Sequence, residues 1–268
     1  MTSIINQIHK EHITKYITQN LFNFYLNIAK ENNLTYFESD TYSYVKNVSG
    51  VWPSYTLGFH SKKEMLEKDF HSINNLIEQK LCPPLWIIPQ NELSPELFNL
   101  LKNNNFRPIT KWAGMALELE NLTQIERKTE NFHIKKISEL NDFKSACEII
   151  NASNFDSSKI LPQHLVTICK DNSNEMYALW FENKIVSISL ISYSDGVAGG
   201  YLTATSKEAR GKGFGLAVLA HSLHKAIRKG FCVSVIQSSK MGEKVWEKLG
   251  FQFFNDYTIF WKVGKQFR

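Results

Sequence analysis

The chain has 268 residues, of which 43% are hydrophobic and 21% are charged, with 13 glycines and 7 prolines. This composition is typical of a folded protein and excludes disordered, collagenous and low-complexity classes. The length allows one large domain or two ordinary ones. The formal net charge of +5 is too small to indicate nucleic-acid binding, so we expect no nucleic-acid partner.

No apolar run approaches the roughly 18 residues that a membrane-spanning helix needs, and the first twenty residues lack the pattern of a secretion signal. The four cysteines, Cys82, Cys147, Cys169 and Cys232, are isolated from one another and form no C-x-x-C pair. Reduced thiols are the natural interpretation. We therefore expect a cytoplasmic protein that has no membrane partner.

The basic charge is concentrated in the second half of the chain, where residues 131–268 carry 18 basic and 12 acidic groups. Six of these basic residues lie close together in the sequence: Lys207, Arg210, Lys212, Lys225, Arg228 and Lys229. They indicate either a site for a small polyanionic ligand or a solvated helix face, and the pattern alone leaves both open.

In the first half, hydrophobic periodicity and turn residues predict four strands and three helices. Ser94 is expected to cap the third helix, with Pro95 in its first turn. In chain order the elements are a helix at 4–30, strands at 36–48 and 52–59, a helix at 62–81, a strand at 84–89, a helix at 94–106 and a strand at 112–120. A polar stretch follows, and we place a domain boundary near residue 126, between domains 1–126 and 131–268.

In the second half the predicted order is β-α-α-β-β-β-α-β-α-β. The last segment is one long strand or two hairpinned strands, and the helix before Gly230 carries one buried stripe. The elements are a strand at 132–137, helices at 139–153 and 161–171, strands at 176–182 and 184–194 that turn at Asn183, a strand at 199–206, a glycine-rich turn at 208–215, a helix at 216–227, a strand at 231–237, a helix at 241–250 and strand residues at 251–263.

The ends of the two halves look alike, because each has a short apolar strand, a helix, a turn that ends in phenylalanine and a closing strand. The two stretches are LWIIPQNELSPELFNLLKNNNF and VSVIQSSKMGEKVWEKLGF. A degenerate internal duplication explains this likeness. The alternative is that the two halves acquired the same β-α-β pattern independently.

The segment Arg210-Gly211-Lys212-Gly213-Phe214-Gly215 lies between a predicted strand and an amphipathic helix. Glycines let the backbone turn sharply and approach a ligand, and the following helix adds the positive end of its dipole. This pattern indicates a cradle for a pyrophosphate. The chain has no G-x-x-x-x-G-K-[ST] loop, no G-x-G-x-x-G fingerprint and no G-x-S-x-G elbow, and its histidine pairs lack further ligands, so we expect no metal.

The stretch YLTATSKEARGKGFGLAVLAHSLHKAIRKG, followed by VSVIQSSKMGEKVWEKLGF, resembles the acetyl-CoA-binding core of the GCN5-related N-acetyltransferase (GNAT) superfamily. The resemblance runs from residue 131 to the end. It is strongest to a bacterial subgroup whose N-terminal half is a degenerate copy of the fold. It implies an α/β (α+β) fold class, with a mixed, mostly antiparallel sheet flanked by helices and a degenerate GNAT-like domain before it.

The resemblance also implies how acetyl-CoA, the co-substrate, would be held. Backbone groups of Thr203, Ala204 and Thr205 would pair with the pantetheine arm. The pyrophosphate would lie on the glycine-rich turn, whose residues are Arg210, Gly211, Lys212, Gly213, Phe214, Gly215 and Leu216. Ser239 and Trp246 would line the arm near its sulfur. Ser239 as a helix cap and Trp246 as a core residue are the alternatives.

The chain departs from the family where a tyrosine usually serves as general acid toward the leaving thiolate, because Trp246 stands there. An indole N–H donates a hydrogen bond but delivers no proton. No carboxylate in the sequence stands out as the base that must deprotonate the amine. Tyr201, Asp256, Tyr257 and Asn154 could reach the acyl end, and of these Tyr201 is taken as the catalytic candidate. A structural role is the alternative for each of the four, and water is the favoured base.

These observations predict an acyltransferase enzyme that moves an acetyl group from acetyl-CoA to a primary amine by direct attack on the thioester. A non-catalytic acyl-CoA-binding or regulatory protein is the alternative, followed by a structural partner protein. The sequence does not specify the acceptor, and it leaves open whether the protein forms a homodimer.

Overall fold

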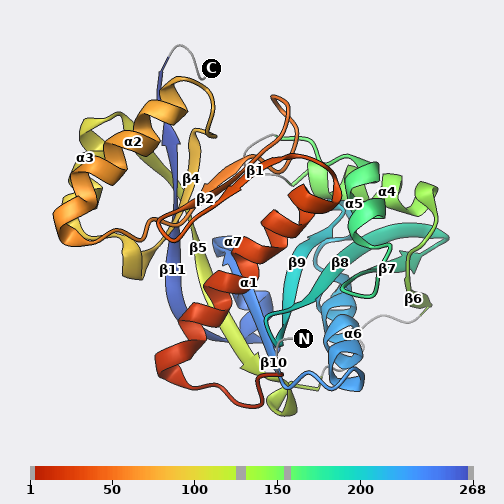
Figure 1. The fold of residues 1–268 in the computed structure, drawn as a ribbon. Coiled ribbons are helices and arrows are strands. Elements are labelled where there is room, and N and C mark those ends of the chain that lie inside the picture. The colour runs from red at the N-terminus through yellow and green to blue at the C-terminus, as the bar shows by residue number, and fades with distance from the viewer. Residues whose placement is uncertain (1–3, 125–130, 154–157, 265–268) are drawn as a thin grey trace.

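The computed structural model describes residues 4–124, 131–153 and 158–264 (Figure 1). The domain boundary predicted near residue 126 lies outside these residues. Within them, eleven strands form a single sheet. The strands are β1 (Thr35–Glu38), β2 (Ser43–Lys46), β3 (Tyr55–Leu57), β4 (Leu85–Pro89), β5 (Phe106–Glu118), β6 (Phe132–Lys136), β7 (Asn174–Phe181), β8 (Lys184–Ser194), β9 (Val197–Thr205), β10 (Val233–Ser239) and β11 (Gln252–Lys262).

Seven α-helices pack on this sheet in the described ranges. They are α1 (Lys10–Glu31), α2 (Leu66–Glu78), α3 (Pro95–Asn103), α4 (Leu140–Asn151), α5 (Pro162–Ile168), α6 (Phe214–Arg228) and α7 (Lys240–Glu247). None of the helices in the described part of the chain combines the length and the apolar character needed to cross a bilayer.

The predicted element order of the second half is confirmed, and residues 252–262 form one strand rather than a hairpin. Ser94 caps α3, since its hydroxyl accepts a hydrogen bond from the Leu97 N–H at 3.1 Å, and Pro95 follows at the first helical position. The turn between β7 and β8 places Glu182 and Asn183 at φ 50° and 60°, which suits a two-residue hairpin.

The first helix begins later than predicted, at Lys10 rather than near residue 4. The preceding backbone pairs with distant parts of the chain. The Ile5 N–H donates to the Gly196 carbonyl at 2.9 Å, and the Ile8 N–H donates to the Glu118 carboxylate at 2.8 Å. These tertiary hydrogen bonds replace the helical ones that the local periodicity predicts.

The strand order is β1-β2-β3-β4-β11-β5-β10-β9-β8-β7-β6, so the closing strands of the two halves are exchanged. β11 lies between β4 and β5, while β5 lies between β11 and β10, and all three pairings are antiparallel. Each half therefore completes its sheet with a strand from the other half.

The topology also repeats along the chain. β1-β2-β3-α2-β4-α3-β5 follows the same course as β7-β8-β9-α6-β10-α7-β11, and in each case the third and fourth strands of the series are parallel. The remaining pairings in the sheet are antiparallel. This repeat fits the duplication interpretation, which stays a prediction.

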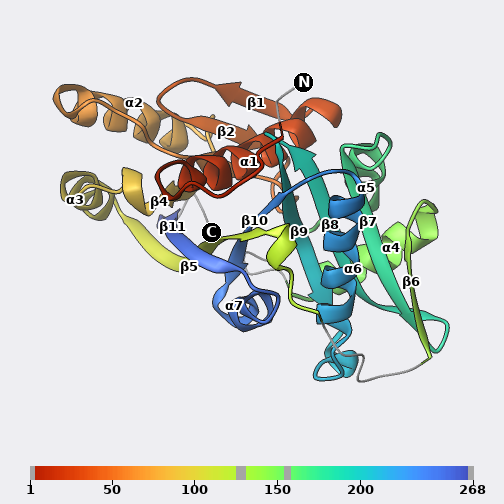
Figure 2. The same ribbon diagram turned by 90° about the horizontal axis from the view of Figure 1, so that it is seen from below.

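Helices cover both faces of the sheet, with α1 crossing one face and α7 lying against the other (Figure 2). One core joins α1, α4 and α5 to the first face. A second core joins α6 and α7 to the opposite face, and a third lies between α2, α3 and the sheet. Neighbouring residues of β4 show the alternation, because Ile87 faces the core of α1 and Trp86 faces that of α2 and α3.

Candidate functional site

The glycine-rich turn leads from the end of β9 into α6. Gly211 and Gly213 have φ angles of 81° and 82°, the left-handed region that side chains with a Cβ seldom adopt. Gly213 is the N-cap of α6. A Cβ atom placed on Gly211 or Gly213 would meet no atom of the described residues within 4 Å, so the space beside the turn is open among them. A ligand has room to approach the backbone here.

The start of α6 provides hydrogen-bond donors and positive potential. The first N–H groups of a helix have no acceptor within the helix, and no side chain of the described residues caps α6. Two cations flank the turn: the Arg210 Nε–H donates to the Thr205 carbonyl at 3.3 Å, and Lys212 Nζ lies 5.4 Å from the centre of the Phe181 ring. The arrangement suits an anion.

The other residues of the turn fix it against β9. Phe214 is buried with its ring near Phe181, so only its backbone faces the turn. A Cβ on Gly215 would lie 3.0 Å from the Thr205 hydroxyl, so glycine permits this close approach. The Thr205 hydroxyl in turn lies 2.8 Å from the Ser187 hydroxyl of β8. Leu216 is half-buried and packs against the core of α6.

Next to the turn, β9 and β10 diverge. Their parallel pairing covers Ala198 to Gly200 on β9 and ends at the Gly200–Ile236 pair in the described part of the chain, although both strands continue. β9 also bulges against β8, and Leu202 there has a φ of 47°. Among the described residues, no strand pairs with the edge of β9 that faces β10 at residues 203–205.

Trp246 of α7 lies over this point of divergence. A Cβ on Gly200 would come within 2.9 Å of the indole ring, so glycine at 200 lets the ring sit directly on β9. The indole is 7% exposed and packs edge-on against Phe251 at 5.0 Å. Trp246 is therefore a core residue that also borders the gap between the strands, and the two interpretations made from the sequence are compatible.

Ser239 occupies the N-cap position of α7 and is exposed, but within the described part of the chain its hydroxyl makes no capping hydrogen bond. A Cβ on Gly242, in the first turn of α7, would lie 3.6 Å from that hydroxyl. The side chain thus lies at the end of β10, beside the first turn of α7.

Tyr201 lies on the face of β9 that α1 covers. Its hydroxyl donates to Asn20 Oδ1 at 2.5 Å, and its ring stacks on Phe24 with centres 3.8 Å apart. Burial raises the pKa of Tyr201 well above 10, and the nearby Tyr25, Asp195 and Tyr257 side chains raise it further by smaller amounts. The hydroxyl is committed to Asn20 and holds its proton, so this geometry favours a packing role.

The remaining candidates for the base are dispersed. Burial raises the pKa of Tyr257, whose hydroxyl lies 2.7 Å from the Thr18 hydroxyl of α1. Asp256 is near the surface, 3.8 Å from Lys111 Nζ. Asn154 lies outside the described residues. In the described ranges no group of three or more histidine, cysteine, aspartate or glutamate side chains is arranged to hold a metal ion.

The contribution of α1 to this region was not anticipated from the sequence. Besides Asn20 and Thr18, α1 provides the Ile17 carbonyl, which accepts a hydrogen bond from Gln237 of β10 at 2.9 Å. The three contacts fasten α1 to β9, β10 and β11 on the face opposite α6. They join residues about 180 to 240 positions apart, which local patterns do not reveal.

In the first half, the backbone after β3 corresponds to the end of β9, and a side chain already binds it. After β3, the Phe59 N–H donates to the Glu92 carboxylate at 2.6 Å, and the Trp86 indole N–H donates to the Gly58 carbonyl at 2.8 Å. Burial raises the pKa of Glu92, an effect that the Phe59 N–H and His60 partly offset. The Glu92 side chain thus binds the backbone after β3, at the position that corresponds to the unpaired edge of β9.

No protein-family model and no curated protein sequence matches the chain. Among solved structures, it is similar to a GCN5-related N-acetyltransferase from Kribbella flavida, with a TM-score of 0.70, 12% identity and coverage of 93% of this chain and 96% of that one. The chain has the GNAT fold. Another GCN5-related N-acetyltransferase, from Sphaerobacter thermophilus, gives a TM-score of 0.60 at 13% identity, covering 77% of this chain and 70% of that one.

A tandem GNAT protein from the clavulanic acid biosynthesis pathway is also similar, with a TM-score of 0.58 and 9% identity, over 82% of this chain and 77% of that one. At such identities the likeness concerns the fold. A tandem GNAT arrangement agrees with the repeated topology of the two halves described above.

Proposed function

We propose that the protein is an acetyl-CoA-dependent N-acetyltransferase whose acceptor is a primary amine. The observation that carries this proposal is the open glycine-rich turn at the start of α6 beside the unpaired edge of β9. Gly211 and Gly213 leave open space beside the backbone, into which a Cβ atom would project, next to N–H donors and two cations. These features fit a pyrophosphate joined to an extended arm.

In this proposal the amides of residues 210–216 hold the pyrophosphate, and the Arg210 and Lys212 side chains add charge. The backbone of Thr203, Ala204 and Thr205 pairs with the pantetheine arm, which then passes Ser239 and Trp246. When bound, acetyl-CoA supplies the activated acyl group. The closed position at Glu92 supports a single such site, in the second half of the chain.

The transfer is proposed to be direct, from the thioester to the amine, since the cysteines are poorly suited to carry an acyl group. Burial raises the pKa of the Cys82, Cys147 and Cys169 thiols to about 12, which suppresses the nucleophilic thiolate. Cys232 immediately precedes β10, at the end of that strand remote from the gap.

The attacking amine, with an ordinary pKa near 10, must lose a proton before it attacks. Because the Tyr201 hydroxyl already donates to Asn20, we assign this proton to water. N–H groups near Ala204 and Thr205 stabilise the oxyanion, and Ser187 steadies this segment by donating to the Ala204 carbonyl at 3.2 Å.

A panel of primary amines tests the proposal in a CoA-release assay with the full chain. We expect release of the thiol from acetyl-CoA to depend on the amine, with at least one amine well above the hydrolytic background. A non-catalytic acyl-CoA-binding protein, which tryptophan at position 246 would suit, gives no amine-dependent release. That result across polyamines, amino acids, aminoglycosides and lysine peptides would contradict the enzyme assignment.

A further inference from the structure

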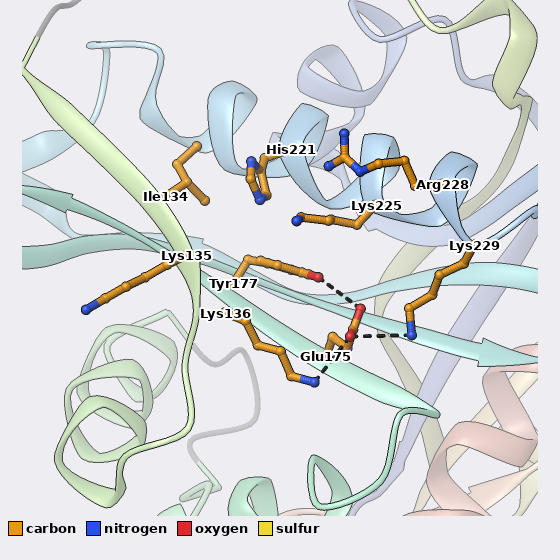
Figure 3. Close-up of a pocket in the computed structure, with 9 residues that line it drawn as sticks. All are labelled: Ile134, Lys135, Lys136, Glu175, Tyr177, His221, Lys225, Arg228 and Lys229. Atoms are coloured by element: carbon orange, nitrogen blue, oxygen red, sulfur yellow. Dashed lines mark hydrogen bonds and ion pairs between the residues drawn. The ribbon is translucent and has the colours of Figure 1, made fainter.

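A surface pocket of about 450 Å³ lies between β6, β7 and the C-terminal half of α6 (Figure 3). It is separate from the glycine-rich turn. At 1.5 Å per residue, the helix separates Leu216 from Arg228 by about 18 Å. Residues at the two ends of α6 therefore belong to different sites.

Glu175 of β7 anchors one wall of this pocket. Its Oε1 lies 3.2 Å from Lys136 Nζ and 3.4 Å from Lys229 Nζ, and its Oε2 accepts hydrogen bonds from the hydroxyls of Tyr177 at 2.9 Å and Tyr193 at 3.0 Å. Burial alone would raise the pKa of Glu175, but these donors together hold it below its ordinary value. The carboxylate is thus ionised and fully engaged, and it fixes two ammonium groups at the pocket edge.

Two further cations, Lys225 and Arg228, project from α6 on the opposite wall (Figure 3). Glu175 is the only carboxylate among the described residues that line the pocket, so positive charge exceeds negative charge in this lining. Cations in the last turns of a helix commonly offset its dipole. Here Lys136 reaches the same pocket from β6, so positive charge converges from two elements.

The other lining residues are less polar. Ile134 and the rings of Tyr177 and His221 contribute apolar surface, and the two rings lie 5.1 Å apart. Lys135 points away from the other cations, with its Nζ 4.6 Å from the centre of the Trp180 ring (Figure 3). The pocket therefore combines a cationic rim with an apolar and aromatic part.

We propose that this pocket binds a phosphorylated small molecule, whose phosphate contacts Arg228 and Lys225 and whose uncharged part packs against Ile134, Tyr177 and His221. A guanidinium beside ammonium groups matches the several acceptor oxygens of a phosphate. The volume falls in the range of about 300 to 1,000 Å³ that is typical of small-ligand sites, and exceeds what a phosphate alone needs. This site is independent of the proposed acetyl transfer.

Inorganic pyrophosphate added to the full chain tests this proposal, with the His221 ring signals in an NMR spectrum as a readout specific to the pocket. We expect the His221 signals to shift in a saturable manner. The double variant Lys225→Gln/Arg228→Gln should bind pyrophosphate at least tenfold more weakly at this site. Lys68→Gln, which removes an exposed lysine from α2, should bind it as the wild type does.

Arg228 and Lys68 are exposed and Lys225 is half-buried. The double variant and the Lys68→Gln variant should therefore unfold at the same temperature as the wild type. His221 signals that stay unmoved at millimolar pyrophosphate in the wild type would overturn the proposal, and this result needs no variant to fold. So would an undiminished His221 shift in the double variant. A single-stranded oligonucleotide that shifts His221 at lower concentration than pyrophosphate would instead reassign the pocket to nucleic acid.

Discussion

Replacing Gly213 by valine is expected to lower the affinity for acetyl-CoA at least tenfold, which corresponds to about 1.4 kcal/mol. The space beside the turn is open at this position among the described residues, so the branched side chain would occupy the space assigned to the pyrophosphate. Its φ of 82° is also unfavourable for a β-branched residue, which would strain the turn. Isothermal titration calorimetry with the full chain measures the loss.

Gly50 provides a matched control for the backbone effect. Its φ is 75°, and a Cβ there meets no atom of the described residues within 4 Å, as at Gly213. Gly50→Val should therefore lose a similar amount of stability while binding acetyl-CoA as the wild type does. Unchanged affinity in a folded Gly213→Val chain, or an equal loss in both variants, would overturn the assignment of the turn.

Trp246→Tyr is expected to raise kcat at least tenfold, because in the proposed complex the phenol adds a general acid beside the leaving sulfur. General acids contribute about 10² to 10⁴ in rate. A thiol of pKa near 8.5 leaves as a thiolate at a cost of roughly 2 kcal/mol at neutral pH, so the wild type is expected to be slow but active. Steady-state kinetics with saturating acetyl-CoA measures the change.

Trp246→Phe is the matched control for this prediction. Both substitutions shrink a side chain that is 7% exposed and packs on Gly200 and Phe251, so both lose comparable packing. The phenylalanine variant should keep kcat within a few-fold, since no proton donor is lost. If it abolishes turnover with fold and cofactor binding intact, the indole N–H has a catalytic role and the acid-free mechanism is wrong.

Much of the second half could be predicted from the sequence because its signals are local. The glycines before α6 and the turn at Asn183 depend on backbone conformations that few residues adopt, and both lie where they were expected. In the first half, the cap at Ser94 is likewise a local contact over three residues. The structure places Trp246 beside the point where β9 and β10 diverge, and its role at the cofactor stays a prediction.

The exchange of β5 and β11 could not be predicted in this way. Both strands carry apolar residues and pair antiparallel on both edges, so their local patterns are compatible with either half. The fastening of α1 to the sheet depends on single polar contacts, such as that between Asn20 and Tyr201, which leave no periodic signal. For the same reason the engagement of the Tyr201 hydroxyl became visible only in the structure.

The most direct test of the account is a crystal structure of the full chain with CoA. We expect one CoA molecule per chain, with its pyrophosphate on the backbone of residues 210–216 and its arm between β9 and β10, ending near Trp246. The position beside Glu92 in the first half should stay free of CoA. A CoA molecule bound there, or in the pocket of Lys225 and Arg228, with the turn at Gly213 empty would contradict the account.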